Sequence, residues 1–353
     1  MQPQNNNCSV QESSPFMKFM KKNRWSIFFV LRELSWRIGQ INMDDMIKFA
    51  EEFNPDLFFI PLYTYTYVDY VFLKLKKIID VPVMFEASLD VYTLKQISYD
   101  PIYWADRFYN RHMIRKVLNL GDLLYVISER QKKDYSRIFS IPCKVIYKMP
   151  QTERMNKVYC GRTEDKLKIL YTGNIGDGRW ESLAYLANAI NKCGDARLDI
   201  YTATPITKQM ERVLNIPGTS YLHEPVPALK VKKLQSEADI LVHVESFKLK
   251  NKLMVRYSIS TKIMDYISAA RCILAICPED VASYEYLRDH QLAYVVNNPE
   301  RIELEVNRLL NDEDKIIEYA NKCREFSQIS LNAEMMRASM RKDIEKVSRK
   351  LEI

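Results

Sequence analysis

Short apolar runs alternate with longer amphipathic segments along most of the chain. Runs such as KILY, DILVHV and CILAI are apolar at consecutive positions, which is typical of strands that are covered on both faces. Between these runs, apolar residues recur at helical spacing. The alternation predicts an α/β protein built on parallel sheets.

The predicted elements fall into two groups. In the first half we predict strands at 57–62, 81–85, 123–128 and 144–147, and helices at 43–53, 66–79, 104–120 and 129–139. In the second half we predict strands at 167–172, 197–202, 239–244, 272–277 and 292–296, and helices at 179–193, 205–215, 227–237, 260–270, 299–311, 313–326 and 332–350. The stretch 148–166 is polar and lacks periodicity, so we interpret it as a linker between two domains.

Length and composition narrow the function classes. A chain of 353 residues is long enough for two domains, and its net charge of +7 is modest and dispersed, which disfavours nucleic-acid binding. The seven cysteines include no CxxC pair, and the four histidines lack metal-ligand spacing. We therefore expect reduced thiols, no metal and a cytoplasmic location. The polar segment 1–15 is predicted to be a disordered tail, not a signal peptide.

The first candidate site is the segment YTGNIGDGRWESL, residues 171–183. It predicts a strand, a loop containing glycines, and a helix that begins near Arg179. Glycines let the backbone approach a ligand closely, a helix N-terminus attracts anions, and an arginine adds donors for phosphate oxygens. The spacing GxxGxG differs from the dinucleotide fingerprint GxGxxG. An ordinary strand–turn–helix junction is the alternative interpretation.

The second candidate site is RYSISTKIMDYISAA, residues 256–270. Ser260 is placed to cap a helix, with Thr261, Lys262 and Asp265 on the face opposite its apolar positions. Hydroxyls and a lysine at a helix start suit a diphosphate, and Asp265 could accept hydrogen bonds from ribose hydroxyls. The alternative is a capped helix with a solvated polar face.

Functional and structural interpretations compete at three further places: the strand end with His243 and Glu245, the residue Asp90, and the segment 16–38. Glu245 ends a buried strand, where ligands of open sheets gather, whereas His243 alternates with apolar residues and is typical of a core histidine. Asp90 follows a strand of the first half, where it could contact a hydroxyl acceptor as a catalytic carboxylate or cap the next segment. Aromatic and basic residues interleave over 16–38, which fits a helix on an anionic membrane or one packed on its own domain.

Taken in order, several segments resemble the family-four group of GT-B glycosyltransferases over about residues 45–330. The segments are NPDLFFIPL, GDLLYVISERQKKDY, the GNIG loop with the Arg179 helix, ADILVHVES, and RYSISTKIMDYISAARCILAICPED. The resemblance implies two Rossmann-like domains: an acceptor-side domain at 16–150 and a nucleotide-sugar donor domain at 151–330. It also implies that a C-terminal helix within 331–353 packs back toward the first domain.

The resemblance further implies a retaining transfer of sugar from a nucleotide diphosphate sugar to a hydroxyl of a glycan or lipid-linked acceptor, in polysaccharide synthesis and without a metal or cofactor. Carried over by position, the residues that would face the donor phosphates are Gly173, Asn174, Arg179, Ser260, Thr261 and Lys262, with Arg256 as a further candidate. Asp265 stands where the family has its ribose-binding glutamate. Glu245 could replace part of the family's EX7E pair, because Tyr257 stands eight residues before Asp265.

The family's first strand and glycine-rich loop have no counterpart before NPDLFFIPL. This predicts an incomplete N-terminal sheet and a helical segment at 16–40. Two other functions stay open for such a chain. One is a non-catalytic, glycosyltransferase-like binding subunit, which the missing strands favour. The other is a sugar-nucleotide epimerase, which needs acid–base carboxylates and a histidine in its cleft.

Overall fold

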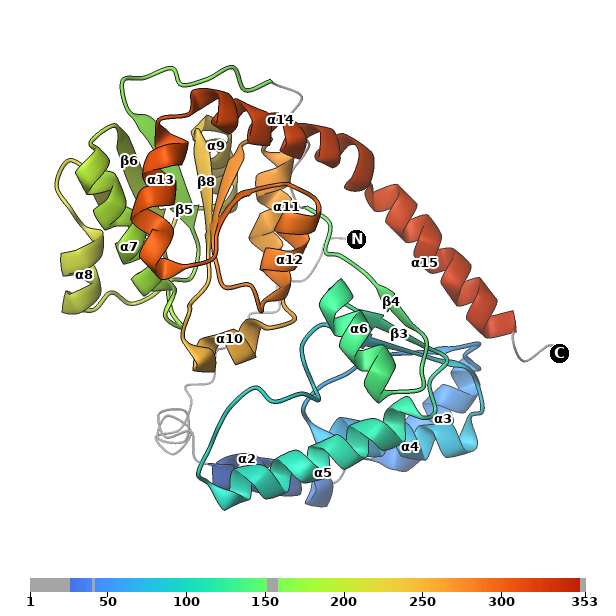
Figure 1. Ribbon diagram of the computed structural model, residues 1–353. Coiled ribbons are helices and arrows are strands. Elements are labelled where there is room, and N and C mark those ends of the chain that lie inside the picture. Colours follow the sequence, from blue (N-terminus) through green and yellow to red (C-terminus); the bar gives the residue numbers. More distant parts are fainter. Residues whose placement is uncertain (1–25, 40–41, 151–157, 350–353) are drawn as a thin grey trace, which may run out of the picture. The chain divides into compact units, whose positions relative to one another are not determined.

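The structure, a computed structural model, describes residues 26–39, 42–150 and 158–349 (Figure 1). Its strands form two sheets in which every strand pair is parallel, and helices connect them. This confirms the predicted α/β class with two Rossmann-like sheets. The tail predicted at 1–15 lies outside the described residues.

The first sheet has four strands in sequential order, β1-β2-β3-β4. They are β1 (Phe58–Pro61), β2 (Val83–Ala87), β3 (Leu123–Val126) and β4 (Cys143–Val145). After β3, the Ser128 hydroxyl accepts a hydrogen bond from the Gln131 amide and so caps α6 (Glu129–Ile138). In the described part of the chain that precedes β1 there is no strand, and helix α2 (Ser26–Ile38) is followed by α3 (Met43–Phe53).

The second sheet has six strands in the order β10-β9-β8-β5-β6-β7. They are β5 (Leu167–Thr172), β6 (Ala196–Tyr201), β7 (Ser220–His223), β8 (Ile240–Val244), β9 (Cys272–Ile276) and β10 (Tyr294–Val296). Its helices are α7 (Arg179–Cys193), α8 (Lys208–Leu214), α9 (Ala228–Glu237), α10 (Leu249–Val255), α11 (Thr261–Ser268), α12 (Ala282–Asp289), α13 (Ile302–Leu310), α14 (Glu313–Ser330) and α15 (Ala333–Ser348).

Both faces of this sheet are covered by helices, which explains the consecutive apolar residues in its strands. In β8, Val242 and Val244 pack in one hydrophobic cluster with α7 and α13, while Leu241 packs in another with α11 and α12. Figure 1 shows these two pairs of helices flanking the sheet. Each helix layer therefore meets alternate residues of the same strand. The loops that follow its strands are therefore attached to a sheet that is packed on both faces.

The chain divides into two compact units that differ from the predicted domains. The first is helical; in the described residues it contains α2, α3, α4 (Thr66–Ile78) and α5 (Pro101–Leu118). The second contains both sheets and the remaining helices. Within the second unit, Asp343 of α15 accepts a hydrogen bond of 2.7 Å from the Tyr125 hydroxyl of β3. The domain boundaries at 150 and 330 stay predictions.

Three elements were missed by the sequence analysis: β7, α10 and α12. The strand β7 has only four residues, SYLH, and their polar and aromatic character gives no clear period. Helix α10 has seven residues, none of them buried, so it carries no apolar face to detect. In contrast, the structure has the predicted strand 167–172 and the predicted helix 179–193 with the same bounds. Their apolar patterns are clear, and glycines directly follow the strand and flank the helix.

Candidate functional site

The loop after β5 needs glycine at two positions. Gly173 has a φ of +137° and Gly178 a φ of +77°, backbone conformations that side chains disfavour. A Cβ on Gly173 would lie 2.3 Å from the Lys262 Nζ atom, and one on Gly178 would lie 2.5 Å from the Ser246 hydroxyl oxygen. The loop therefore depends on glycine for its shape and for the close approach of Lys262.

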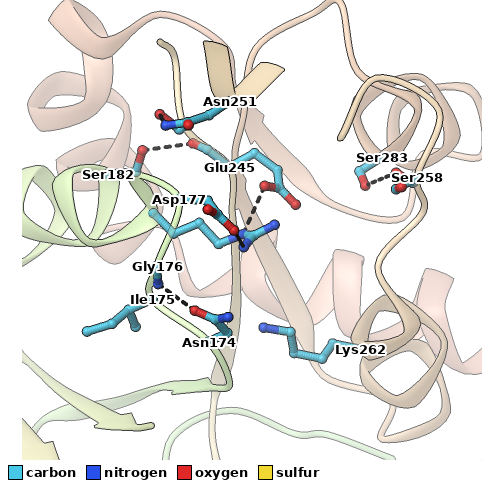
Figure 2. Close-up of polar contacts among 12 residues, drawn as sticks. Asn174, Ile175, Gly176, Asp177, Ser182, Glu245, Asn251, Ser258, Lys262 and Ser283 are labelled. Carbon is cyan, nitrogen blue, oxygen red and sulfur yellow. Dashed lines mark hydrogen bonds and ion pairs between the residues drawn. The ribbon is translucent and has the colours of Figure 1, made fainter. Parts of the chain in front are cut away.

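Asn174 holds this loop together. Its backbone carbonyl accepts a hydrogen bond of 2.6 Å from the Tyr171 hydroxyl. Its side-chain oxygen accepts one from the Gly176 amide and another, at 3.1 Å, from the Thr204 hydroxyl (Figure 2). The amide side chain thus ties the loop after β5 to the loop after β6.

A cavity of about 710 Å³ opens at the carboxyl ends of β5, β6 and β7. Its wall includes Thr172, Gly173, Asn174, Gly176, Asp177, Tyr201, Thr202, Ala203, Thr204, Pro205, Pro225, Val226, Val231 and Lys262. The volume falls in the usual range for small-molecule sites, about 300–1,000 Å³. Open parallel sheets bind ligands at this edge. The cavity is therefore the best candidate for a ligand site in the described residues.

Lys262 places an amino group in the wall of this cavity. It is the second residue of α11, and its Nζ donates a hydrogen bond of 3.2 Å to the Tyr171 hydroxyl and lies 4.5 Å from the centre of that ring. Figure 2 shows its side chain pointing from α11 toward Asn174. Burial and, second, the charge of Arg179 lower the pKa of Lys262 to about 8, against the opposing effect of Glu245.

Arg179 and Glu245 form a buried ion pair beside the loop. The Arg179 Nε donates a hydrogen bond of 2.9 Å to Glu245, and Asp177 lies 3.8 Å from a terminal nitrogen of the same guanidinium (Figure 2). Burial raises the pKa of Glu245, while Arg179 works to lower it. Burial alone would lower the pKa of Arg179, but the charge of Glu245 outweighs this effect and the net pKa is raised.

His243 lies on β8, buried as predicted. Burial lowers its pKa to about 3, and the charges of Lys262 and Arg179 contribute to the same shift. The imidazole is therefore neutral at ordinary pH. The expectation that it would be a fully bonded core histidine was wrong in part, because its Nε2 has no partner within the described residues.

Two predicted donor residues, Ser260 and Thr261, lie at a different cavity. Ser260 occupies the N-cap of α11, but its side chain makes no capping hydrogen bond to any described residue, so the predicted cap was wrong. Ser260 and Thr261 instead line a second cavity of about 490 Å³ with Glu86 and Lys148. The N-terminus of α11 therefore separates the two cavities, and the longer Lys262 side chain reaches the first.

Arg256 contacts the first sheet's helix α6. Its terminal nitrogen lies 3.2 Å from the Asp134 carboxylate, which also accepts a hydrogen bond of 2.7 Å from the Tyr257 hydroxyl. Asp265 lies one turn after Lys262 and is half-buried, and the described wall of the first cavity does not include it. A role in donor binding stays a prediction for both residues.

Asp90 holds the turn that follows β2. Its Oδ1 accepts hydrogen bonds from the amides of Tyr92 (3.0 Å) and Thr93 (2.9 Å) and from the Tyr135 hydroxyl (2.8 Å). These bonds match the capping alternative for this buried carboxylate. A catalytic role for Asp90 stays a prediction.

The sequence analysis missed much of the cavity wall. Thr202 and Thr204 directly follow β6, so the rule that ligands gather after parallel strands could have found them. Pro225 and Val226 follow β7, which was not predicted.

The described residues contain neither a cluster of metal ligands nor a membrane-spanning helix. No three His, Cys, Asp or Glu side chains there converge as metal ligands. None of the helices there has the length together with the apolar character that a bilayer crossing requires. The predictions of a metal-independent reaction and of a cytoplasmic location remain predictions.

Replacing Gly173 with alanine should weaken the site more than it weakens the fold. The positive φ costs roughly 1–2 kcal/mol for a residue with a Cβ, and the new methyl group would displace the Lys262 amino group. Gly194→Ala is the matched control, because Gly194 also has a positive φ but no described atom lies within 4 Å of its added Cβ. Urea unfolding should show a similar loss for both variants, while the affinity for a nucleoside diphosphate, the ligand group that the sequence resemblance implies, should fall in Gly173→Ala alone. Equal affinities of the two variants for this ligand would contradict the contact with Lys262.

This chain resembles solved structures in its fold but shares little of their sequence. No protein-family model and no curated protein matches the sequence. The solved structure of HepE from Anabaena with UDP matches with a TM-score of 0.63 at 12% identity, covering 86% of this chain and 82% of HepE. Sucrose-phosphate synthase from Thermosynechococcus elongatus matches with a TM-score of 0.60 at 13% identity, covering 89% and 79%.

A third match is TarM of S. aureus, solved with UDP, with a TM-score of 0.57 at 12% identity. The match covers 84% of this chain but only 58% of TarM, so the chain spans less than two thirds of that protein. At these identities the matches establish the fold alone. They confirm that the chain has the two-sheet GT-B architecture of these glycosyltransferases.

Proposed function

We propose that this chain transfers a sugar from a nucleotide diphosphate sugar, such as a UDP-sugar, to a hydroxyl acceptor. The observation that carries the proposal is the cavity at the carboxyl ends of β5 and β6, with the Lys262 amino group in its wall. The matching structures of HepE and TarM were solved with UDP, which supports UDP as the first nucleotide to test.

The residues around the cavity suit the stabilisation of a leaving diphosphate. Lys262 supplies a cation at the start of α11, where helix amides and the helix dipole also favour an anion. Arg179 supplies a second cation, and Glu245 fixes its orientation through the 2.9 Å hydrogen bond. Preorganised cations of this kind lower the barrier to departure of a diphosphate. In this proposal the reaction is retaining, needs no metal and serves polysaccharide synthesis.

The acceptor side of the proposal rests on the second cavity. It is lined by Glu86 near the end of β2, by Lys148 after β4, and by Ser260 and Thr261 at the start of α11. Carboxylate and hydroxyl groups are suitable partners for the hydroxyls of a glycan or lipid-linked acceptor. Sharing α11 between two cavities would bring a donor and an acceptor to the same helix end.

Affinity for UDP should fall as pH rises through about 8. The pKa of Lys262 is lowered to about 8, so the ammonium that attracts a diphosphate is lost above that pH. A bound diphosphate favours the charged form, so the pKa of Lys262 should rise in the complex. Above about pH 8, the neutral lysine must therefore take up a proton when UDP binds. The affinity should then fall by up to about tenfold for each further pH unit. Calorimetric titrations between about pH 6.5 and 9.5 would measure this slope, and an affinity that stays constant would contradict it.

The reaction itself can be tested by product analysis. The protein would be incubated with UDP-glucose, UDP-galactose and UDP-N-acetylglucosamine, with and without a mixture of oligosaccharide acceptors. Released UDP together with an acceptor one sugar heavier by mass spectrometry is the expected result. A change of the sugar nucleotide into its epimer would instead identify an epimerase. UDP binding without turnover would identify a binding subunit.

Membrane contact through residues 16–38 also remains a proposal, of which the structure describes α2. At helical spacing, Ile27, Leu31, Leu34 and Ile38 share one side of α2, and all four are exposed. Exposed aliphatic groups on one side suit insertion at a bilayer surface. Flotation with vesicles of phosphatidylglycerol would test this contact.

A further inference from the structure

Four aromatic rings stack in series within the helical unit. Trp36 of α2 stacks on Tyr67 with ring centres 5.0 Å apart, Tyr67 on Tyr65 at 6.0 Å, and Tyr65 on Tyr63 at 6.2 Å. The planes of successive rings differ by 13°, 21° and 25°. We call these four residues the aromatic ladder. Its three tyrosines come from the alternating sequence YTYTY, which starts soon after β1.

The rings of the ladder are only partly covered by one another. Near-parallel rings whose centres are about 6 Å apart are offset like steps, so each leaves part of its face free. The exposed fractions agree with this, at 50% for Trp36, 47% for Tyr63 and 36% for Tyr65. Large aromatic side chains that gather on a surface mark a binding site more often than isolated ones do.

Buried polar contacts hold the ladder in place. Glu33 of α2 is only 8% exposed, and its carboxylate accepts hydrogen bonds from the Thr66 hydroxyl (2.9 Å) and the Tyr67 amide (3.2 Å) at the start of α4. The Arg32 guanidinium lies 4.6 Å from the centre of the Tyr65 ring. Two elements far apart in sequence are thereby fixed against each other, so the rings are preorganised before any ligand binds.

We propose that the aromatic ladder binds a carbohydrate chain. A sugar ring has an apolar face of C–H groups, which suits the free face of an aromatic ring, and a rim of hydroxyls. The ladder offers both kinds of partner, since the phenol groups of its tyrosines, the exposed Thr64 and the stacked Arg32 can bond hydroxyls. Several rings in series fit consecutive sugars of an oligosaccharide better than a single sugar. This site rests on the proposed function, because it would hold the glycan that accepts the transferred sugar.

The chemistry of the ladder favours a glycan over an anionic membrane. Helix geometry places Phe29, Arg32 and Trp36 on one side of α2 and the exposed aliphatic residues, such as Leu31, on another. The one carboxylate that contacts the ladder among the described residues, Glu33, is paired with Arg32 at 3.7 Å. The ladder therefore offers little net positive charge to attract an anionic bilayer, whereas a neutral glycan needs none.

A microarray of neutral and acidic oligosaccharides, probed with the full-length protein, tests the proposal without requiring turnover. The wild type should bind at least one set of oligosaccharides of about four or more sugars. Tyr65→Ala and Trp36→Ala should each lower affinity for that set by about tenfold, the loss expected for one aromatic stacking contact. Tyr65→Phe should keep most of the affinity because it keeps the ring. Tyr99→Ala, a change at an exposed tyrosine of the same unit outside the ladder, should have no effect.

UDP binding, measured in parallel, separates this proposal from the proposed function. Unchanged UDP affinity in Tyr65→Ala shows that the second unit is folded, and an unchanged far-ultraviolet circular dichroism spectrum shows that the helical unit keeps its helices. A loss of glycan binding then belongs to the ladder. Failure of the wild type to bind any oligosaccharide, while it still binds UDP, would overturn the ladder site alone. Glycan binding that persists in both alanine variants would also overturn it. The same holds if the wild type binds phosphatidylglycerol vesicles but no glycan, and the alanine variants lose the vesicle binding.

Discussion

Replacing Arg179 with methionine is expected to lower the free energy of unfolding by about 3–5 kcal/mol, the usual loss when one partner of a buried ion pair is removed. The pair is well buried, with side-chain exposures of 17% for Arg179 and 8% for Glu245. Without the guanidinium, the Glu245 carboxylate keeps its desolvation cost and loses its strongest partner. Urea unfolding followed by circular dichroism would measure the loss.

A double variant separates the structural role of Arg179 from its proposed role with the ligand. In Arg179→Met/Glu245→Met the buried charges disappear together, so much of the stability should return. UDP affinity should stay low in both variants because the cation is absent from both. Arg301→Met is the matched control, since its pair with Glu305 is on the surface and should contribute less than about 1 kcal/mol. A loss in Arg179→Met no larger than in Arg301→Met would contradict the buried pair.

Replacing Lys262 with alanine is expected to weaken UDP binding by roughly 10- to 150-fold, which corresponds to about 1.5–3 kcal/mol for a hydrogen bond to a charged group. The lysine amino group lies in the cavity wall between Tyr171 and the Gly173 loop. The fold should tolerate the change, because removing a buried cation also removes its desolvation cost. Isothermal titration calorimetry with UDP gives the affinity directly.

Lys192→Ala is the matched control for this experiment. Lys192 lies at the end of α7, is exposed, and pairs with Glu303 on the surface. Its loss should change UDP affinity by less than about twofold, because exposed charges are screened by solvent and salt. If Lys262→Ala bound UDP as tightly as Lys192→Ala does, Lys262 could not be a ligand of the diphosphate.

The pattern of the sequence predicted the second sheet better than the details of its site. Strands such as β5 and β8 are apolar on both faces because helices cover both, and that periodicity is a local property of the chain. Gly173 and Lys262 were found because glycine in a loop after a strand and lysine at a helix start each have a local physical meaning. They lie close together because both follow strands of one parallel sheet at its carboxyl edge.

The partners of individual side chains could not be predicted in the same way. Arg256 lies four residues before Ser260, yet its guanidinium bonds Asp134, which is 122 residues away in sequence. Ser260 has the residue type of a helix cap, but a side-chain rotamer decides whether it caps, and tertiary packing selects the rotamer. The aromatic ladder likewise needs Trp36 from a distant helix, although its YTYTY segment is visible in the sequence.

The most direct test of the proposed donor site is a crystal structure of the protein with UDP. We expect the diphosphate in the cavity at the carboxyl ends of β5 and β6, with a phosphate oxygen within hydrogen-bond distance of the Lys262 Nζ and close to the Gly173 backbone. UDP bound at another place on the chain, with this cavity left open, would contradict the assignment of the donor site.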